Sequence, residues 1–449
     1  MERILVKEDI VNLLKEEYNK KESSVVYIKG EFGVGKSSVI FEFINQNRIK
    51  ALHYFALDES DKANRDSFRD TVLDFNELPC LRNVDFSWDL SFKCYMGGLF
   101  LDKRVVIIEN VHRLIKYNYH FPKSLFDSYI KYLKEHNVLL IVTGELTESY
   151  LEEIFLSENI KTVTLEKLSF EDFKKYYPTD PIRMYALTNG LSYYMNHFTY
   201  DNYLENIYAT ILNKSHILYE LPYFDLSRLC GEGLRKQLLI LKAVVKGYHT
   251  IEDVTNYLQI ERKDVFFMLN RLVDLNILKK DISINGLVLS KNYEIRYAFE
   301  NSFMEVWLKL NYCNRQSLNK SLVHKININK SLESIFQETY INICYQYLKN
   351  KKISYQYIAK YYEDNIMVDL VSVDEENKKI IIGDCFYLEE EKGIDCYELL
   401  LDLYNKYIKP KYKNYQLEKI IIFNEYGFSN QLINLKKEDP RILFLSNKK

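Results

Sequence analysis

Hydrophobic positions in the first third of the chain form short β-branched runs that are separated by longer amphipathic stretches. Such runs are typical of buried strands. Between them, stretches such as Ser67–Phe75 and Pro122–Glu135 space their apolar residues like helices. Strands that alternate with helices predict an α/β fold, a parallel sheet with helices on both faces. The predicted strands are Val25–Ile28, Ala51–Ala56, Val105–Glu109, Val138–Thr143 and Thr162–Leu165.

After residue 165 the pattern becomes mostly helical. Residues 166–230 form one helical region, and residues 231–300 begin with the three helical patterns "LRKQLLILKAVVKG", "TIEDVTNYLQ" and "RKDVFFMLNRLVDLNIL". "DISINGLVLS" follows, and we expect it to be a β-hairpin with Asn285-Gly286 as a type I′ turn. Three helices and a hairpin make a winged helix. A helical bridge covers 301–330, and residues 331–449 return to an α/β pattern.

The stretch "VVYIKGEFGVGKSSVIFEF" carries the spacing of a phosphate loop, G-x-x-x-x-G-K-[ST]. It lies between an apolar strand and a helical pattern, as the mechanism of such a loop requires. Its backbone N–H groups and the helix N-terminus would surround phosphate oxygens, Lys36 would reach the β- and γ-phosphates, and the Ser37 hydroxyl would bind Mg²⁺. The predicted cofactors are therefore ATP and Mg²⁺. The predicted binding residues are Gly30, Gly33, Gly35, Lys36, Ser37 and Ser38.

A second nucleotide motif is predicted in "KRVVIIENVHRL", where an apolar strand ends in Glu109-Asn110. The usual pair is Asp-Glu, in which the first acid supports Mg²⁺ and the second polarises the attacking water. Glu109 can still serve Mg²⁺, but Asn110 cannot take a proton and could only orient a water. Glu145 could compensate, or it could be a solvated loop carboxylate. Thr143 could sense the γ-phosphate, or it could form a cap or turn.

Composition narrows the class of protein. Lys and Arg (61) nearly balance Asp and Glu (63), so net charge gives no global attraction to nucleic acid or membrane. No apolar run is long enough to span a membrane, and the seven cysteines show no metal-binding C-x-x-C pairs. The charged start "MERILVKEDI" is unlike a secretion signal. We expect a cytoplasmic protein with reduced cysteines.

In these motifs the chain resembles archaeal-type P-loop ATPases of the AAA+/STAND-like group. The resemblance rests on the order of "GEFGVGKSS", Trp88, "VVIIENVHRL", "VTGEL", "VTLEKLSFEDF", "ALTNGLSYYM", "LYELP" and "YEIRYAFENSFMEVWLKL". It implies a P-loop ATPase core in residues 1–165, a helical lid in 166–230 and a winged helix in 231–300. The chain departs from the family pattern at the second motif and in the lid, where Asn189 and Ser192 replace Gly and Pro.

The resemblance also implies a restriction-endonuclease-like PD-(D/E)xK domain in residues 331–449. Glu338 lies in a helical pattern, and Asp369 and Asp384 lie on two predicted strands joined by a polar turn. An active nuclease needs a lysine two residues after the second acid, and Phe386 occupies that position. The three acids could still form a metal cluster. Lys392 could replace the lysine, although we expect it to be a solvated surface residue, so an inactive binding domain is predicted.

The function predicted from these features is an ATP-binding switch with slow or regulatory ATPase activity. The winged helix could contact DNA phosphates through basic residues, or pack on the ATPase core instead. An ATP-gated DNA nuclease and a non-catalytic DNA-binding regulator are the alternatives. ATP or ADP is the expected ligand, a protein partner and an oligomer are left open, and no membrane partner is expected. The basic residues are Arg262, Lys263, Arg271, Lys279 and Lys280.

Overall fold

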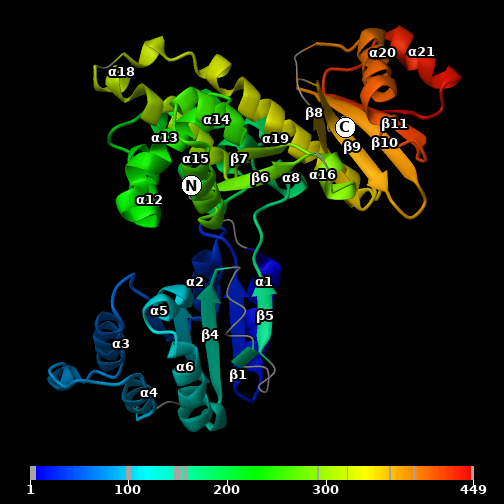
Figure 1. Cartoon of the computed structure of the whole chain (residues 1–449). Helices are drawn as coiled ribbons and strands as arrows, with labels where there is room; N and C mark the ends of the chain where they lie inside the picture. Colours follow the sequence, from blue (N-terminus) through cyan, green and yellow to red (C-terminus); the bar gives the residue numbers. More distant parts are fainter. Residues whose placement is uncertain are drawn as a thin grey trace. The chain divides into compact units, whose positions relative to one another are not determined.

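The structure, a computed structural model, describes residues 7–97, 103–145, 153–154, 160–290, 293–320, 322–363, 366–387 and 390–445. The chain divides into two compact units (Figure 1). The first unit consists of Met1–Leu168 with Leu191–His197, and the second consists of Ser169–Gly190 with Phe198–Lys449.

The first unit is built on a five-stranded sheet in the order β2-β3-β4-β1-β5, and every pairing in it is parallel. All five strands predicted from the sequence are confirmed. Because β4 lies between β1 and β3, the phosphate-loop strand and the second-motif strand both direct their carboxyl ends to the edge where Thr143 lies. The strands are β1 (Ser24–Lys29), β2 (Leu52–Phe55), β3 (Arg104–Glu109), β4 (Val138–Gly144) and β5 (Lys161–Thr164).

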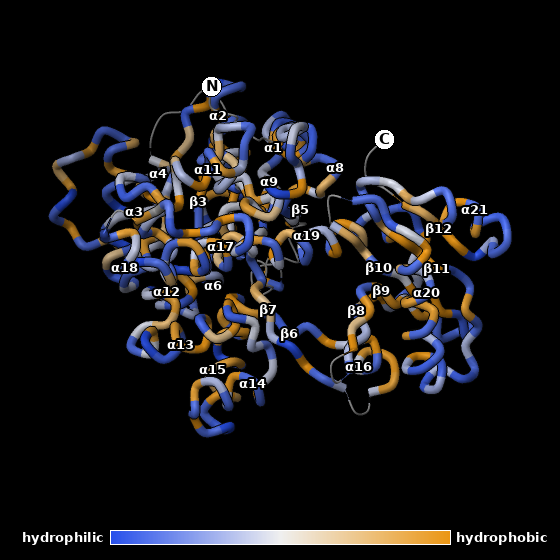
Figure 2. The backbone as a smooth tube through the Cα atoms, turned by 90° about the horizontal axis from the view of Figure 1, so that it is seen from above, coloured by the Kyte–Doolittle hydropathy of each residue, from blue (hydrophilic) through white to orange (hydrophobic). Residues whose placement is uncertain are grey.

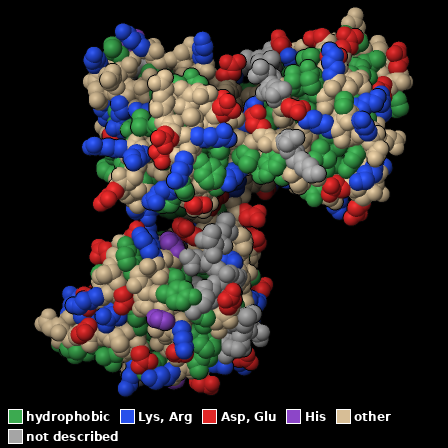
Figure 3. Space-filling view, in the orientation of Figure 1, with side chains coloured by type: hydrophobic (Ala, Val, Ile, Leu, Met, Phe, Trp, Pro, Cys, Tyr) green, Lys and Arg blue, Asp and Glu red, His purple; other side chains and the backbone are tan. Residues whose placement is uncertain are grey.

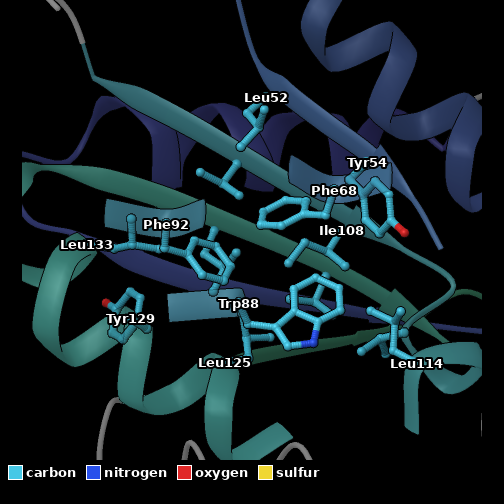
Figure 4. Close-up of a cluster of buried hydrophobic side chains, with 14 of the residues drawn as sticks. Leu52, Tyr54, Phe68, Trp88, Phe92, Ile108, Leu114, Leu125, Tyr129 and Leu133 are labelled. Carbon is cyan, nitrogen blue, oxygen red and sulfur yellow. The ribbon is translucent and has the colours of Figure 1, made fainter. Parts of the chain in front are cut away.

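Helices cover this sheet, and aromatic side chains fill the core on one face. Trp88 is 5% exposed and packs beside Phe68, with 5.3 Å between the ring centroids (Figure 4). The ring centroid of Phe121 lies 4.7 Å from that of Trp88. Its Nε1 donates to Asp61 Oδ1 at 3.1 Å, so the polar atom of the indole is satisfied in the core. The helices are α1 (Glu8–Asn19), α2 (Lys36–Asn47), α3 (Asp61–Phe75), α4 (Trp88–Met96), α5 (Val111–Tyr117), α6 (Phe121–Ser128) and α10 (Ser192–His197).

The second unit begins with helices and ends in a sheet. The segments of this unit that the sequence predicted to be helical do contain helices. In residues 231–300, an antiparallel pair of strands, β6 (Leu278–Ile282) and β7 (Ile295–Phe299), follows the third helix. The helices before the sheet are α8 (Phe170–Phe173), α9 (Pro181–Thr188), α11 (Tyr203–Ala209), α12 (Leu221–Cys230), α13 (Leu234–Val245), α14 (Ile251–Leu258), α15 (Arg262–Asp274), α16 (Ile284–Val288), α17 (Ser302–Leu310), α18 (Arg315–Asn319) and α19 (Ile328–Asn350).

The predicted tight hairpin at Asn285-Gly286 is wrong. These residues lie in α16, and β6 pairs with the later segment that begins at Ile295. Ile284 is completely buried in the core of the C-terminal sheet, and the Tyr412 hydroxyl donates to Asn285 Oδ1 at 3.2 Å. A tertiary contact therefore overrides the local turn preference of Asn-Gly.

The C-terminal sheet has the order β12-β11-β10-β9-β8. β8, β9 and β10 are antiparallel, whereas β10, β11 and β12 are parallel, so this sheet is mixed. Hydrophobic residues follow β9 and β10 in Figure 2, which agrees with the two strands predicted there. The elements are β8 (Tyr357–Glu363), β9 (Ile366–Asp374), β10 (Lys379–Phe386), α20 (Ile394–Leu403), β11 (Gln416–Asn424), α21 (Asn430–Glu438) and β12 (Ile442–Leu445).

The surface in view mixes both signs of charge. Figure 3 shows Lys and Arg side chains interspersed with Asp and Glu, as the balanced composition predicts. Within the described ranges, none of the helices has the length and apolar character needed to cross a membrane.

Candidate functional site

The backbone of the phosphate loop depends on its glycines. Gly33 has φ +81° and Gly35 has φ +104°, a region that side chains with a Cβ rarely adopt. A Cβ on Gly33 would also lie 2.9 Å from the Cβ of Tyr193. α2 begins directly after Gly35, at Lys36. The loop therefore presents backbone N–H groups at a helix N-terminus, which is the geometry that anions prefer.

Lys36 and Ser37 point into the region where the loop closes. Lys36 Nζ donates to the carbonyl oxygens of Gly30 at 2.6 Å and of Glu31 at 3.0 Å. Burial lowers the pKa of Lys36, and the nearby carboxylates Glu145, Glu109 and Glu31 oppose that shift. A β- or γ-phosphate would replace the two carbonyls with stronger, charged acceptors.

Glu109, at the end of β3, is held by two neighbours. It is 1% exposed, and its Oε2 accepts a hydrogen bond from the Ser37 hydroxyl. Its Oε1 lies 2.6 Å from Nε2 of His53, which comes from the adjacent strand β2. Because a carboxylate can only accept, Nε2 of His53 carries the hydrogen. His53 thus orients the acid that faces the phosphate-loop serine.

These oxygens fit Mg²⁺, which prefers hard oxygen ligands and keeps several waters together with phosphate oxygens. Ser37 and Glu109 already meet, so both would hold the ion, Ser37 through its hydroxyl and Glu109 through its carboxylate. When bound, Mg²⁺ would neutralise charge that develops on the β- and γ-phosphate oxygens. His53 would keep Glu109 in place.

Asn110 takes a left-handed backbone conformation, with φ +60° and ψ +42°. Asn tolerates this region better than most residues. Its backbone N–H donates to Thr143 Oγ1 at 3.0 Å, and Thr143 is completely buried. The turn-forming role proposed for Thr143 therefore has a concrete contact, and sensing of the γ-phosphate stays a prediction.

Glu145 lies near the same edge of the sheet. Its side chain is 49% exposed, as a loop carboxylate would be, but its Oε1 lies 3.5 Å from Nε2 of His112. Among the carboxylates that oppose the lowered pKa of Lys36, it has the largest effect. Glu145 therefore stays a candidate for the group that compensates for Asn110.

The helix α10 contacts the phosphate loop directly. The backbone N–H of Tyr193 donates to Gly33 O at 2.9 Å, and the Ser192 hydroxyl donates to Val34 O at 3.3 Å. The ring centroids of Phe32 and Tyr193 are 5.5 Å apart. Ser192 is one of the lid positions at which the chain departs from the family pattern, and its hydroxyl gives the loop a bond that proline could not make.

The second unit holds another cluster, which lies on the C-terminal sheet. Asp369 of β9 and Asp384 of β10 lie close together, since Asp384 Oδ1 accepts from the backbone N–H of Asp369 at 3.3 Å. Burial raises the pKa of Asp369 to about 6. Burial, and then the charge of Asp369, raise the pKa of Asp384 to about 8. The two predicted acids are therefore brought together.

Glu338 does not join them in a metal-binding group. Both of its carboxylate oxygens lie 2.5 Å from Nζ of Lys360, a buried lysine of β8. In the part of the chain that the structure describes, no three His, Cys, Asp or Glu residues are placed to hold a metal ion. The prediction of a three-acid metal cluster is corrected here, because an ion pair occupies Glu338.

Lys392 is not a solvated surface lysine, which corrects a second expectation. Its side chain is only 13% exposed, and its Nζ lies 2.7 Å from Glu390 Oε1. The same Nζ lies 4.8 Å from the centroid of the Phe386 ring. In the nuclease motif, Phe386 holds the position of the lysine. Two other lysines, Lys360 and Lys392, therefore lie near the acids or near Phe386.

The acid pair predicts a pH-dependent stability. A carboxyl whose pKa is raised on folding binds a proton that the unfolded chain has lost, so stability falls as pH rises from about 4 to about 8. Asp384→Asn keeps the shape and removes the charge. At pH 8.5 we expect it to raise the free energy of opening of β9 and β10 by at least about 1.4 kcal/mol, the equivalent of one pKa unit. At pH 4.5 we expect little change.

Hydrogen exchange of peptides that cover β9 and β10 measures this free energy in the full chain. Asp395→Asn, which changes an acid outside the buried pair, is the matched control. Equal destabilisation by Asp384→Asn at both pH values would contradict the prediction.

Sequence reasoning missed His53, His112, Lys360 and Gln337. His53 and His112 reach the site through strand order, which the sequence does not reveal. Lys360 left a signal, because it interrupts the apolar run "YIAKYY" in a segment that was not assigned as a strand. Gln337 Nε2 donates to Cys385 O at 2.6 Å and lies 3.4 Å from Asp369 Oδ2.

Comparisons with known proteins give distant similarities. No protein-family model matches the chain. A protein of Methanocaldococcus jannaschii described as uncharacterized is 20% identical over 420 residues, which cover 89% of this chain and 91% of that protein.

Among solved structures, the Walker-type ATPase paby2304 of Pyrococcus abyssi has a TM-score of 0.40 and 14% identity, over 67% of this chain and 95% of that chain. The ORC1 protein of Aeropyrum pernix, solved in complex with DNA, has a TM-score of 0.38 and 10% identity, over 71% and 91%. Because these similarities are distant, the P-loop fold of the first unit rests on the unit's own parallel sheet and strand–loop–helix motif.

Proposed function

We propose that this protein is a P-loop ATPase that binds ATP with Mg²⁺, hydrolyses it slowly and uses the bound nucleotide as a switch. The observation that carries the proposal is the contact between Ser37 and Glu109, with Lys36 beside them and Asn110 next in the chain. Binding groups are complete, whereas the position that usually polarises water holds an amide.

The chemistry follows from what each side chain can do. Lys36 binds β- and γ-phosphate oxygens, Ser37 and Glu109 hold Mg²⁺, and Asn110 donates or accepts a hydrogen bond without taking a proton. A positioned base contributes about two to four powers of ten to such a rate. Turnover should therefore lie well below the range of about 1–100 per second that is common for phosphoryl transfer.

A route for the switch begins at α10. Its two hydrogen bonds end on the carbonyls of Gly33 and Val34, inside the phosphate loop. In the sequence α10 lies between α9 and α11, so a change in the loop on nucleotide binding would be passed to the helices on either side of it in the chain. The chain thus connects α10 directly to helices of the second unit, which supports the proposal of a regulatory role for the nucleotide.

Single-turnover hydrolysis of ATP·Mg²⁺ tests the proposal. We expect a rate below about 1 per second together with retention of nucleotide on the protein. Rapid turnover in the wild type would contradict the slow-switch function and would direct attention to Glu145.

DNA binding by residues 231–300 is a further part of the proposal. Arg262, Lys263 and Arg271 are exposed on α15 and would contact phosphates. Phe266 and Phe267 are also exposed, by 46% and 59%, which favours a protein partner on the same helix. Binding of duplex DNA that weakens steeply with salt would support DNA as the partner. If no DNA binds, a protein partner on α15 remains.

The second candidate function is metal-dependent nuclease activity in the C-terminal domain. One observation favours it, because Lys360 supplies a buried cation near Asp369. Glu338 and Lys360 are engaged with each other, however, and the described residues of this domain bring two acids together without a third. An inactive binding domain therefore remains the proposal.

We expect no Mg²⁺-dependent cleavage of plasmid DNA by the wild type, because two carboxylates without a third donor hold a metal poorly. Asp384→Ala should match the wild type in this assay. Cleavage that is lost in Asp384→Ala and Lys360→Met but kept in Lys392→Met would overturn this expectation and establish the nuclease.

A further inference from the structure

A pocket of about 670 Å³ lies in the second unit, away from the phosphate loop in the sequence. Its lining includes Arg183 of α9, Tyr203 of α11, Lys330 and Phe336 of α19, and Tyr387 after β10. This volume falls in the range of about 300–1,000 Å³ that is usual for small-molecule sites.

Arg183 lies near three aromatic rings of the pocket lining. Its guanidinium carbon lies 5.1 Å from the ring centroid of Tyr203, 5.8 Å from Phe336 and 5.9 Å from Tyr387. Tyr203 and Phe336 are only 7% and 4% exposed, whereas the Arg183 side chain is 26% exposed. The three rings therefore lie close to the guanidinium, part of which stays exposed.

A second cation and a helix N-terminus lie beside this platform. α19 is 23 residues long, and its first turn begins at Ile328 with Asn327 as its N-cap. Lys330 is exposed in that turn. Arg183 also lies 3.3 Å from Asp180 Oδ2, which offsets part of its charge. Glu333 also lines the pocket, so the charges of Arg183 and Lys330 are balanced by those of Asp180 and Glu333. The Asn327 side chain accepts from the backbone N–H of Lys330, so an anionic group of the ligand would bind through the side chains of Lys330 and Arg183.

The same wall is linked to the acid pair. The backbone N–H of Tyr387 donates to Gln337 Oε1 at 3.2 Å. The amide nitrogen of Gln337 donates to Cys385 O at 2.6 Å, one residue after Asp384. A ligand that moves Tyr387 would therefore act on the strand that carries Asp384.

We propose that this pocket binds a nucleotide, with its base stacked on the Arg183 plane and Tyr387 and its phosphate at Lys330 and the start of α19. Bases stack on arginine planes and on aromatic rings, and phosphates bind cations at helix N-termini. Glu333 lines the pocket with carboxylate oxygens that can accept from the N–H and O–H groups of a base or sugar, whereas Asn329 Oδ1 already accepts from the Tyr203 hydroxyl. The nucleotide is either free or part of a single strand, and both share this chemistry.

The experiment uses the full-length Lys36→Ala protein, so that binding at the phosphate loop does not interfere. Calorimetric titration with AMP and with a single-stranded thymidine octamer separates the free nucleotide from the strand. We expect at least one of them to bind with a Kd below about 100 µM. Arg183→Gln and Lys330→Glu should each weaken it at least about tenfold, because each removes a charged contact.

Lys349→Glu reverses an exposed charge at the other end of α19 and is the matched control for Lys330→Glu. It should leave the Kd within about twofold. Lys330→Glu also protects the test against misfolding of Arg183→Gln, because an acid in the first turn suits the helix. Binding weaker than about 1 mM for both probes, or equal losses in Lys330→Glu and Lys349→Glu, would overturn the proposal.

Discussion

Lys36→Ala is expected to abolish the rise in melting temperature that ATP·Mg²⁺ gives the wild-type protein. A ligand at about 100 times its Kd stabilises the folded state by about 2.7 kcal/mol, which is a shift of several degrees. Lys36 donates to the Gly30 and Glu31 carbonyls at the place where phosphate oxygens would bind. Without the ammonium, the β- and γ-phosphates lose their cation, and the melting temperature should not respond to ATP.

Lys93→Ala is the matched control for this measurement. Lys93 is an exposed lysine of α4 in the same unit, so its removal should keep the ATP-dependent shift. Thermal denaturation with and without ATP·Mg²⁺ would be recorded for all three proteins. A full shift in Lys36→Ala would mean that the nucleotide binds elsewhere.

Asn110→Glu is expected to raise the rate of ATP hydrolysis at least about tenfold, the equivalent of about 1.4 kcal/mol in the barrier. Glu can accept the proton of the attacking water, which Asn cannot. Residue 110 has a left-handed backbone conformation, which glutamate tolerates less well than asparagine. We therefore expect Asn110→Glu to be less stable than the wild type. Single-turnover hydrolysis measures the gain.

Asn110→Gln has the same length and the same backbone strain as Asn110→Glu but no basicity. The ratio of these two rates therefore isolates the effect of the carboxylate. Equal rates in the two variants would show that residue 110 does not face the attacking water. A large loss of the wild-type rate in Glu145→Gln would then identify Glu145, with His112 at 3.5 Å, as the group that does.

The sequence alone determined the α/β class and the elements of the first sheet. The apolar runs of β1, β3 and β4 are buried on both sides, so local hydrophobicity and strand propensity agree with the tertiary structure there. The glycines and Lys36 were recognisable because a phosphate loop needs backbone conformations and charges at set spacings, and Gly33 and Gly35 do take positive φ angles. Asp369 and Asp384 were paired correctly through the two strands around a polar turn.

Only the tertiary structure decided which side chains surround these residues. His53 reaches Glu109 because β2 lies next to β3, and Lys360 of β8 reaches Glu338 because α19 packs on the C-terminal sheet. Contacts of this kind depend on strand order and register, which a single sequence does not encode in local patterns. The segment at Asn285 became a helix for a related reason. Burial of Ile284 against the C-terminal sheet outweighs a turn preference that acts only on its immediate neighbours.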